Sequence, residues 1–196
     1  MKAFRSLAAA ALAALVAVAA AQAEPVTVAG VKYEDSTELR GARLQLNGAG
    51  VRYKAVFKVY TAGLYLPAKA STTDEVLAMP GAKRMSITML REIDSAELGK
   101  LFSRGMEDNM DKTAFSKLIP GVLRMSQIFS EHKKLNPGDS FMIDWIPGTG
   151  AIVTVKGVPQ GEPFKEQAFF NALLRIWLGP NPADWKLKEA LLGKAG

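Results

Sequence analysis

Apolar and polar residues alternate along most of the first half of the chain, and such alternation is typical of half-buried β-strands. It predicts three strands, over residues 26–33, 37–46 and 83–90. Between the second and the third, Asn47 to Gly50 favours a turn, because Asn and Gly tolerate positive φ angles. Residues 51–66 follow, rich in Val, Phe, Tyr and Thr, and predict one long strand with a bend at Gly63.

Apolar residues in the second half recur every three or four positions, which is the spacing of amphipathic helices. Helices are predicted to begin near Asp94, to cover residues 115–129 with a break at Pro120, to cover residues 163–178, and to follow Asp184. A hairpin is predicted between them, with strands over residues 141–146 and 152–158. Strands first and helices later favour an α+β fold, in which helices cover one face of an antiparallel sheet.

The N-terminal segment, residues 1–23, has the pattern of a secretory signal peptide. A basic head with Lys2 and Arg5 precedes an uninterrupted run of Ala, Leu and Val, and the last alanines supply the small residues that signal peptidase accepts. The run is shorter than the about 20 residues that a membrane anchor needs. We therefore expect cleavage after Ala23, no stable membrane insertion, and an exported, most simply periplasmic protein with one domain over residues 24–196.

Composition narrows the chemistry without naming a function. The 196 residues include no Cys and one His, which excludes a disulfide framework and a Cys nucleophile and leaves little room for a His-rich zinc site. Basic residues are scattered and matched by acidic neighbours, as Lys112 is by Asp108 and Asp111, so the net charge of +6 does not indicate a nucleic-acid partner. No phosphate-loop, zinc-protease or hydrolase motif occurs, so we expect no cofactor and no metal.

One set of side chains on the long predicted strand is a candidate ligand site. Thr61 and Tyr65 share a face of that strand, and a single bulge would bring Arg52 to the same side. An Arg among apolar and aromatic neighbours is costly to bury unless it meets an anion, and its planar fork suits a carboxylate. The alternative is that Arg52 is an ordinary surface residue beside a turn, and the spacing alone favours that alternative.

Four segments of the chain resemble proteins of a known family. NGAGVR at 47–52, KVYTAGLYL at 58–66, FFNALLRIWLG at 169–179 and LLG at 191–193 are similar to proteins with the chalcone isomerase fold, in particular to the small exported chalcone-isomerase-like proteins of bacteria. The likeness covers about residues 30–193. It implies an open-faced β-sandwich, in which a long antiparallel sheet and a helical layer enclose a ligand cleft.

The resemblance also implies site residues. In plant isomerases of the family, an Arg after Gly-Ala-Gly holds the ligand's oxyanion and a Thr of the next strand polarises its carbonyl, which corresponds to Arg52 and Thr61. Fatty-acid-binding members hold a carboxylate with that Arg and a Tyr of the same segment, for which Tyr65 is the match. The chain departs from the plant enzymes elsewhere, because the following helix has no Tyr, and Phe102 or Ser103 stands where they have Asn.

Three functions are compatible with these observations. The first is non-catalytic binding of a fatty acid or a similar small amphipathic or aromatic anion, in a cleft anchored by Arg52 with Thr61 or Tyr65. The second is a cofactor-free isomerase of the chalcone-to-flavanone type, in which Arg52 stabilises an oxyanion and Thr61 assists. The third is an accessory periplasmic protein with a collapsed cleft. The missing polar residues favour the first function.

Overall fold

The computed structural model describes residues 24–194, so the predicted signal segment, residues 1–23, lies outside the described residues. The strands are β1 (Val26–Val28), β2 (Val31–Tyr33), β3 (Ser36–Leu39), β4 (Ala42–Lys54), β5 (Phe57–Leu66), β6 (Lys83–Met89), β7 (Ile93–Asp94), β8 (Lys134–Leu135), β9 (Ser140–Ile146), β10 (Gly150–Val155) and β11 (Val158–Pro159). The helices are α1 (Thr73–Ala78), α2 (Ser95–Glu107), α3 (Lys112–Ser130), α4 (Gln167–Leu178) and α5 (Trp185–Leu191). None of these helices is long and apolar enough to cross a membrane.

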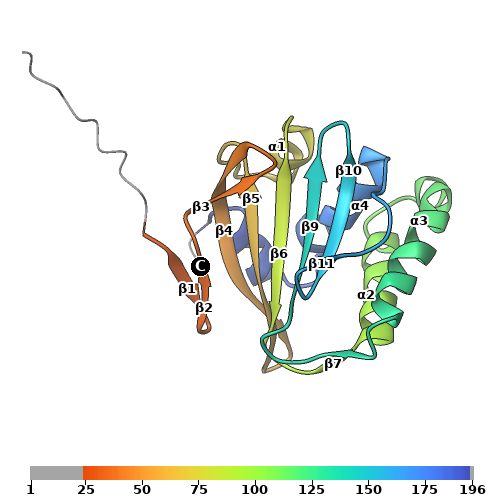
Figure 1. Ribbon diagram of the computed structural model, residues 1–196, viewed down its shortest axis with the longest axis horizontal. Helices are drawn as coiled ribbons and strands as arrows, with labels where there is room; N and C mark the ends of the chain where they lie inside the picture. The colour runs from red at the N-terminus through yellow and green to blue at the C-terminus, as the bar shows by residue number, and fades with distance from the viewer. Residues whose placement is uncertain (1–23, 195–196) are drawn as a thin grey trace, which may run out of the picture.

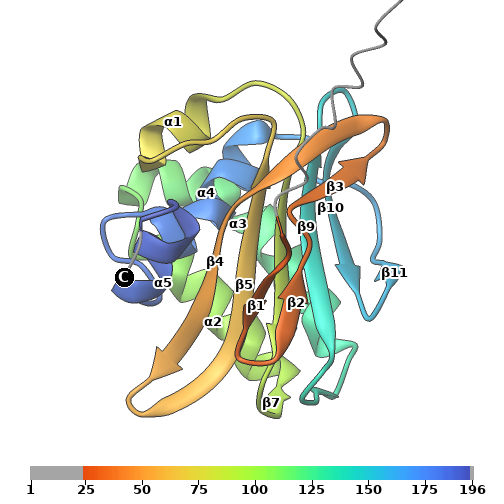
Figure 2. The ribbon, with the colours of Figure 1, turned by 90° about the vertical axis from the view of Figure 1, so that its left-hand side faces the viewer.

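Seven of the strands form one antiparallel sheet in the order β11-β10-β9-β6-β5-β4-β3. Helices α2, α3 and α4 lie on one side of this sheet (Figure 1). The β1–β2 hairpin lies against the opposite face, over β4 and β5 (Figure 2). The predicted α+β class, with a long antiparallel sheet covered by a helical layer, is confirmed.

The alternation along β6 shows how the two faces of the sheet differ. Met85 and Ile87 point toward the helices and are fully buried in the main apolar core. Arg84 points to the other face, where its guanidinium forms a two-pronged pair with the carboxylate of Asp144 on β9, with both N–O distances 2.7 Å. The helical side of the sheet is therefore the apolar side on which a ligand cavity can form.

The first two predicted strands are in fact hairpins. Ala29 and Gly30 form a two-residue turn with φ angles of 48° and 84°, and Arg40 and Gly41 form a second with 50° and 80°. Positive φ at both positions fits the right-handed twist of the flanking strands, and Gly adopts it without a steric cost. The predicted strand over residues 26–33 thus becomes β1 and β2, and the one over residues 37–46 becomes β3 and the start of β4.

The predicted bend at Gly63 is absent, and this glycine instead allows close packing between the sheet and the β1–β2 hairpin. β5 runs through Gly63 without interruption, and the Cα of this glycine lies under the aromatic ring of Tyr33 from β2. A Cβ added at Gly63 would come within 2.5 Å of that ring. The absence of a side chain at Gly63 therefore lets the β1–β2 hairpin lie close to the sheet.

The turn expected at Asn47 to Gly50 is also wrong. These residues lie in the middle of β4, and the chain reverses instead at Ala55 and Val56, so that Lys54 pairs with the first residue of β5. The single strand expected over residues 51–66 is therefore the end of β4 together with all of β5. The small residues have another purpose, because α5 packs directly on this part of β4.

Helix α3 is unbroken, although Pro120 was expected to interrupt it. Asp111 caps its first turn by accepting a hydrogen bond from the Ala114 amide at 2.9 Å. Pro120 removes one amide donor, yet Val122 and Phe129 beyond it are buried against the rest of the core. Phe115 and Leu118, before Pro120, are partly buried against the same core, so packing on both sides of the proline accounts for the continuity of the helix.

The starts of α2 and α5 agree with the sequence, whereas α4 begins at Gln167 and not at residue 163. Asp94 caps α2 by accepting from the Glu97 amide at 3.0 Å, and Asp184 caps α5 by accepting from the Leu187 amide at 3.1 Å. The carboxylate side chains satisfy amides that a helix start leaves free. Their importance here is positional, because α2 and the segment leading into α5 form two walls of the cavity described next.

Candidate functional site

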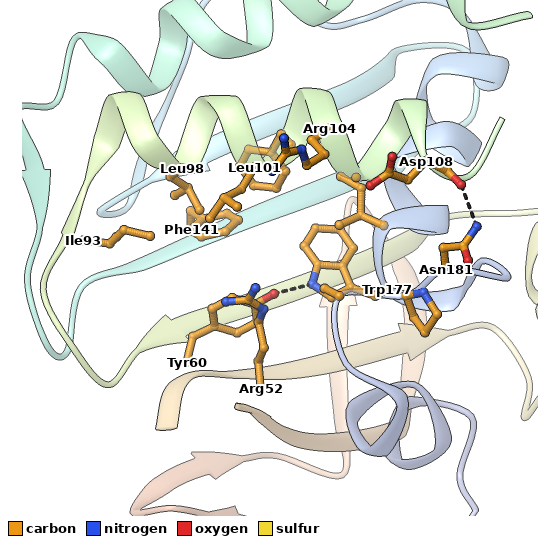
Figure 3. Close-up of a pocket in the computed structure, with 15 residues that line it drawn as sticks. Arg52, Tyr60, Ile93, Leu98, Leu101, Arg104, Asp108, Phe141, Trp177 and Asn181 are labelled. Carbon is orange, nitrogen blue, oxygen red and sulfur yellow. Dashed lines mark hydrogen bonds between the residues drawn. The ribbon is translucent and has the colours of Figure 1, made fainter. Parts of the chain in front are cut away.

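A cavity of about 180 Å³ lies between the sheet and the helical layer, close to the β4–β5 hairpin. Arg52 and Tyr60 enter it from the two hairpin strands, and Trp177 enters it from α4 (Figure 3). Leu98 and Leu101 of α2 lie across from them. The segment joining α4 to α5 completes the wall. The cleft expected between sheet and helices is therefore open in this structure.

Arg52 and Tyr60 form the polar end of the cavity. They are directly opposite each other on β4 and β5, so both side chains project from the same face of the sheet. The guanidinium carbon of Arg52 lies 5.5 Å from the centre of the Tyr60 ring, within the range of a cation–π contact. The ring thus fixes the position of the cation without neutralising it.

The hydroxyl of Tyr60 is oriented by Trp177. The indole Nε1 of Trp177 donates to the Tyr60 oxygen at 2.8 Å, between residues 117 positions apart in the chain. Burial raises the pKa of Tyr60 to about 12, although the nearby Arg52 acts in the opposite direction. The hydroxyl therefore stays protonated, and its hydrogen has no acceptor among residues 24–194. Tyr60 is in a position to donate a hydrogen bond to a ligand.

The guanidinium of Arg52 has no anionic partner in the described part of the chain. Its Nε is buried and makes no hydrogen bond within residues 24–194. The neighbouring Asp184 is occupied, since its carboxylate accepts from the backbone amides of Tyr53 at 2.8 Å and Leu187 at 3.1 Å. A partly buried cation without a counter-charge is unfavourable, so this end of the cavity is suited to an external anion.

The remaining walls are apolar and largely aromatic. Phe102 of α2 meets Trp177 edge-on at 6.0 Å between ring centres, and Phe141 of β9 at 5.8 Å. Gly105 allows α2 to approach α4, because a Cβ there would come within 3.0 Å of Ile176. An apolar cavity with one cationic end is the form that binds an amphiphile with an anionic head.

No group of three His, Asp or Glu side chains in the described residues is arranged to hold a metal ion. The second charged end of the cavity lies on α2, where Arg104 and Asp108 line the rim and both are exposed. Asn181 closes this rim by donating its side-chain amide to the backbone carbonyl of Asp108 at 2.8 Å. The cavity can therefore bind and orient a small anion, with Arg52 as its partly buried charge.

This geometry can be compared with known proteins. A family model described as chalcone isomerase-like matches residues 25–193. The chain belongs to the chalcone isomerase-like family. The expectation drawn from the Gly-Ala-Gly-x-Arg and Tyr-Thr-Ala-Gly-Leu-Tyr segments is thus confirmed at the level of the family.

A solved structure supports the same fold for this chalcone isomerase-like chain. A fatty-acid binding protein of Arabidopsis thaliana superposes with a TM-score of 0.69 at 16% identity, covering 83% of this chain and 92% of that one. At such identity the likeness establishes the fold only. A comparison with curated proteins gives no match.

The structure separates the three residues that the sequence analysis grouped together. Arg52 lines the cavity, whereas Thr61 and Tyr65 lie on the opposite face of the sheet. Thr61 accepts a hydrogen bond from the Tyr33 hydroxyl at 2.8 Å, and Tyr65 donates to the Glu34 carbonyl at 3.1 Å. The expectation that all three share a face is wrong, because the chain reverses at Ala55 and Val56, and the register that follows the shift next to Arg52 places Thr61 opposite Val51 and not on the face of Arg52.

Two residues of the polar end were missed as ligand contacts. The sequence analysis assigned neither Tyr60 nor Trp177 to the ligand site. Placing the turn at residues 55 and 56 would not by itself have found Tyr60, because a regular register pairs Arg52 with residue 59, and only the register shift between Arg52 and Tyr53 places Tyr60 opposite Arg52. No local signal pointed to Trp177, because its role comes from a contact with a strand distant in sequence.

Proposed function

We propose that this chain binds a small apolar carboxylate, such as a short- or medium-chain fatty acid, without transforming it. Arg52 and the Tyr60 hydroxyl hold the carboxylate, while Phe102, Phe141 and Leu98 surround the tail. One observation carries the proposal: a guanidinium without an anion lies beside a free hydroxyl donor at the polar end of an apolar cavity. Charge-assisted hydrogen bonds of this kind are among the strong ones.

Family membership gives independent support. A solved structure that superposes on this chain over most of both lengths is that of a fatty-acid binding protein. In the present chain the hydroxyl beside Arg52 is that of Tyr60, so we assign the second contact to Tyr60 and not to Tyr65 or Thr61.

The cavity size limits the ligand. An apolar cavity of about 150 Å³ accommodates benzene, and sites for drug-sized ligands begin near about 300 Å³. At about 180 Å³ the cavity suits a single aromatic ring or a short acyl tail, with any longer tail leaving through the rim. Octanoate is therefore a suitable probe.

Isomerase chemistry of the chalcone type has less support. The Thr61 hydroxyl that would polarise a carbonyl is fully buried on the other face of the sheet. Tyr60 is held protonated, with a pKa of about 12, so it is a hydrogen-bond donor and not a base near neutral pH. Arg52 remains as an oxyanion partner, which is the same interaction that carboxylate binding uses.

The proposed site of action is the periplasm. It rests on residues 1–23, whose basic head, apolar run and small residues before Glu24 have the pattern of a cleaved signal peptide. Mass spectrometry of the protein recovered from a periplasmic fraction gives the mature N-terminus directly, and the proposal requires Glu24 at that position.

Binding of octanoate, octanol and octyltrimethylammonium by wild-type residues 24–196 tests the function. Isothermal titration calorimetry is expected to show octanoate binding at least about tenfold more tightly than octanol, because hydrogen bonds to charged groups contribute about 1.5–3 kcal/mol. The cation of equal tail length is expected not to bind. Equal affinity for octanoate and octanol would leave only a hydrophobic pocket and would refute an anion-binding site.

A further inference from the structure

Exposed apolar side chains gather at the tip of the β4–β5 hairpin and at the start of α5. Val56 is 81% exposed at the turn, and Tyr53 and Phe57 flank it on the two strands. Trp185, 60% exposed, lies beside them, because the carboxylate of the preceding residue accepts from the Tyr53 amide. We call these four residues the hairpin-tip patch. Figure 2 shows the hairpin extending beyond the body of the sheet.

Cationic side chains surround the hairpin-tip patch. Lys54 and Lys58 lie on the hairpin itself, and no acidic residue occurs between Arg52 and Tyr60. The guanidinium of Arg91 lies 4.4 Å from the ring centre of Phe57. The ammonium of Lys188 lies 4.9 Å from that of Trp185. The patch therefore combines aromatic rings with positive charge.

The acidic residues nearest to the patch are already engaged. Asp184 accepts from two backbone amides at the α5 cap, as described above. Glu92, next to Arg91, is paired with Lys134 at 2.8 Å. Asp184 keeps its negative charge, but the cations Lys54, Lys58, Arg91 and Lys188 outnumber it, so the tip has a net positive charge that complements a negatively charged surface.

The hairpin-tip patch also borders the cavity. Arg52 and Tyr60, at the polar end of the cavity, are on the two strands that carry the tip. Pro182 and Ala183, which line the cavity, directly precede the start of α5. A ligand leaving or entering the cavity on this side passes next to the exposed aromatic side chains.

From these observations we infer that the hairpin-tip patch docks on an anionic phospholipid bilayer, so that the cavity exchanges its ligand with the membrane. Aromatic and apolar side chains with adjacent Lys and Arg are the composition of peripheral membrane-binding surfaces. Basic residues near such a surface add attraction to anionic lipids that is screened by salt. The exchange step rests on the proposed function, whereas docking itself does not.

Vesicle sedimentation with the mature chain tests docking. The vesicles are pure phosphatidylcholine, or equal parts of phosphatidylcholine and phosphatidylglycerol. We expect binding to the anionic vesicles only, with a blue shift of tryptophan emission, because Trp185 is exposed while Trp145 and Trp177 are buried. Equal binding to both vesicle types, or binding to neither, would overturn the inference.

Variants separate the two parts of the patch. The double variant Val56→Ser, Phe57→Ser is expected to weaken binding to anionic vesicles roughly tenfold or more, because apolar contact with the bilayer is lost. The double variant Lys54→Gln, Lys58→Gln is expected to weaken vesicle binding about fivefold for each lysine. Leu123→Ser is the matched control, since Leu123 is equally apolar and 65% exposed on α3 but lies outside the patch. Unchanged binding by both double variants would contradict docking through the hairpin tip.

The same variants distinguish failure of docking from failure of the proposed function. The double variant Val56→Ser, Phe57→Ser is expected to keep the wild-type affinity for octanoate in vesicle-free solution, because neither residue lines the cavity. Loss of vesicle binding with retained octanoate binding supports both proposals. Vesicle binding by a wild-type chain that does not bind octanoate would keep the docking surface and reject the ligand. A concentration-dependent dimer that these variants abolish, without vesicle binding, would assign the patch to a second copy of the chain and overturn the inference.

Discussion

Arg52→Met is expected to weaken octanoate binding by about 10- to 150-fold while leaving octanol binding nearly unchanged. Met keeps an unbranched apolar stem that reaches about as far as Nε but removes the charge and the donors. Hydrogen bonds to a charged group contribute about 1.5–3 kcal/mol, and each 1.4 kcal/mol is tenfold in affinity. Calorimetric titration of the variant with both ligands measures the effect.

The control for Arg52→Met is Arg104→Met, a second cationic residue that lines the same cavity from α2. Arg104 is exposed, and interactions of exposed charges contribute about 0–1 kcal/mol, so the loss is expected to be fivefold at most. An equal loss for both variants would indicate general electrostatic attraction and not a specific contact at Arg52.

Thermal unfolding gives a further readout for Arg52→Met. Burial of the guanidinium with an unpaired Nε is unfavourable, and its cation–π contact with Tyr60 offsets that cost only in part, so its removal is expected to leave the midpoint of unfolding unchanged or higher. A structural role, in which Arg52 pairs with an acid as an accessory function would require, predicts a lower midpoint. Loss of affinity without loss of stability therefore identifies a binding residue.

Gly48→Ala is expected to lower the free energy of unfolding by about 3 kcal/mol, near the upper end of overpacking effects. A Cβ at this position would collide with the backbone carbonyl of Ala190 and lie 3.1 Å from the Gly193 amide. Both are backbone groups of α5 and its end, so the clash is relieved only by moving the helix. Urea unfolding followed by circular dichroism measures the change.

Gly138→Ala is the matched control for the stability measurement. Gly138 lies in a turn with a φ of 88°, and an added Cβ would meet no atom within 4 Å. Only backbone strain opposes this substitution, which predicts a loss of about 1 kcal/mol. A loss at Gly48 no larger than that at Gly138 would mean that α5 does not pack directly on β4.

Turn chemistry explains which strands could be predicted. Ala29-Gly30 and Arg40-Gly41 occupy positive φ in two-residue turns, and an X-Gly pair is the recognisable sign of such a turn. Alternation of apolar residues continued across these pairs, so the sequence analysis extended the strands through them. Ala55-Val56 reverses the chain without a Gly, and no local signal marked that turn.

Two helix starts could be predicted because caps are local, although α1 was missed despite its capping box of Thr72 and Glu75. Asp94 and Asp184 each satisfy an amide three residues away, and both starts were readable from the sequence. Gly48 and Gly50 gave the opposite case, since their small size serves contact with α5, far along the chain. In the sequence, glycines that allow such a close approach cannot be distinguished from glycines that form a turn.

Of the polar end of the cavity, only Arg52 could be predicted from the sequence. Arg52 was identified by its apolar setting and by the family resemblance, and it does line the cavity. Its neighbours were assigned wrongly, because the face of Thr61 relative to Arg52 depends on the position of the turn between them. Trp177, which orients the Tyr60 hydroxyl, is supplied by tertiary packing alone.

A crystal structure of residues 24–196 with octanoate tests most directly whether Arg52 and Tyr60 hold a carboxylate. The account predicts one carboxylate oxygen within hydrogen-bond distance of the Arg52 guanidinium and one accepting from the Tyr60 hydroxyl. The tail should lie against Phe102 and Trp177, with the Trp177–Tyr60 hydrogen bond retained. A carboxylate bound at the exposed rim near Arg104, with Arg52 still unpaired, would contradict the account.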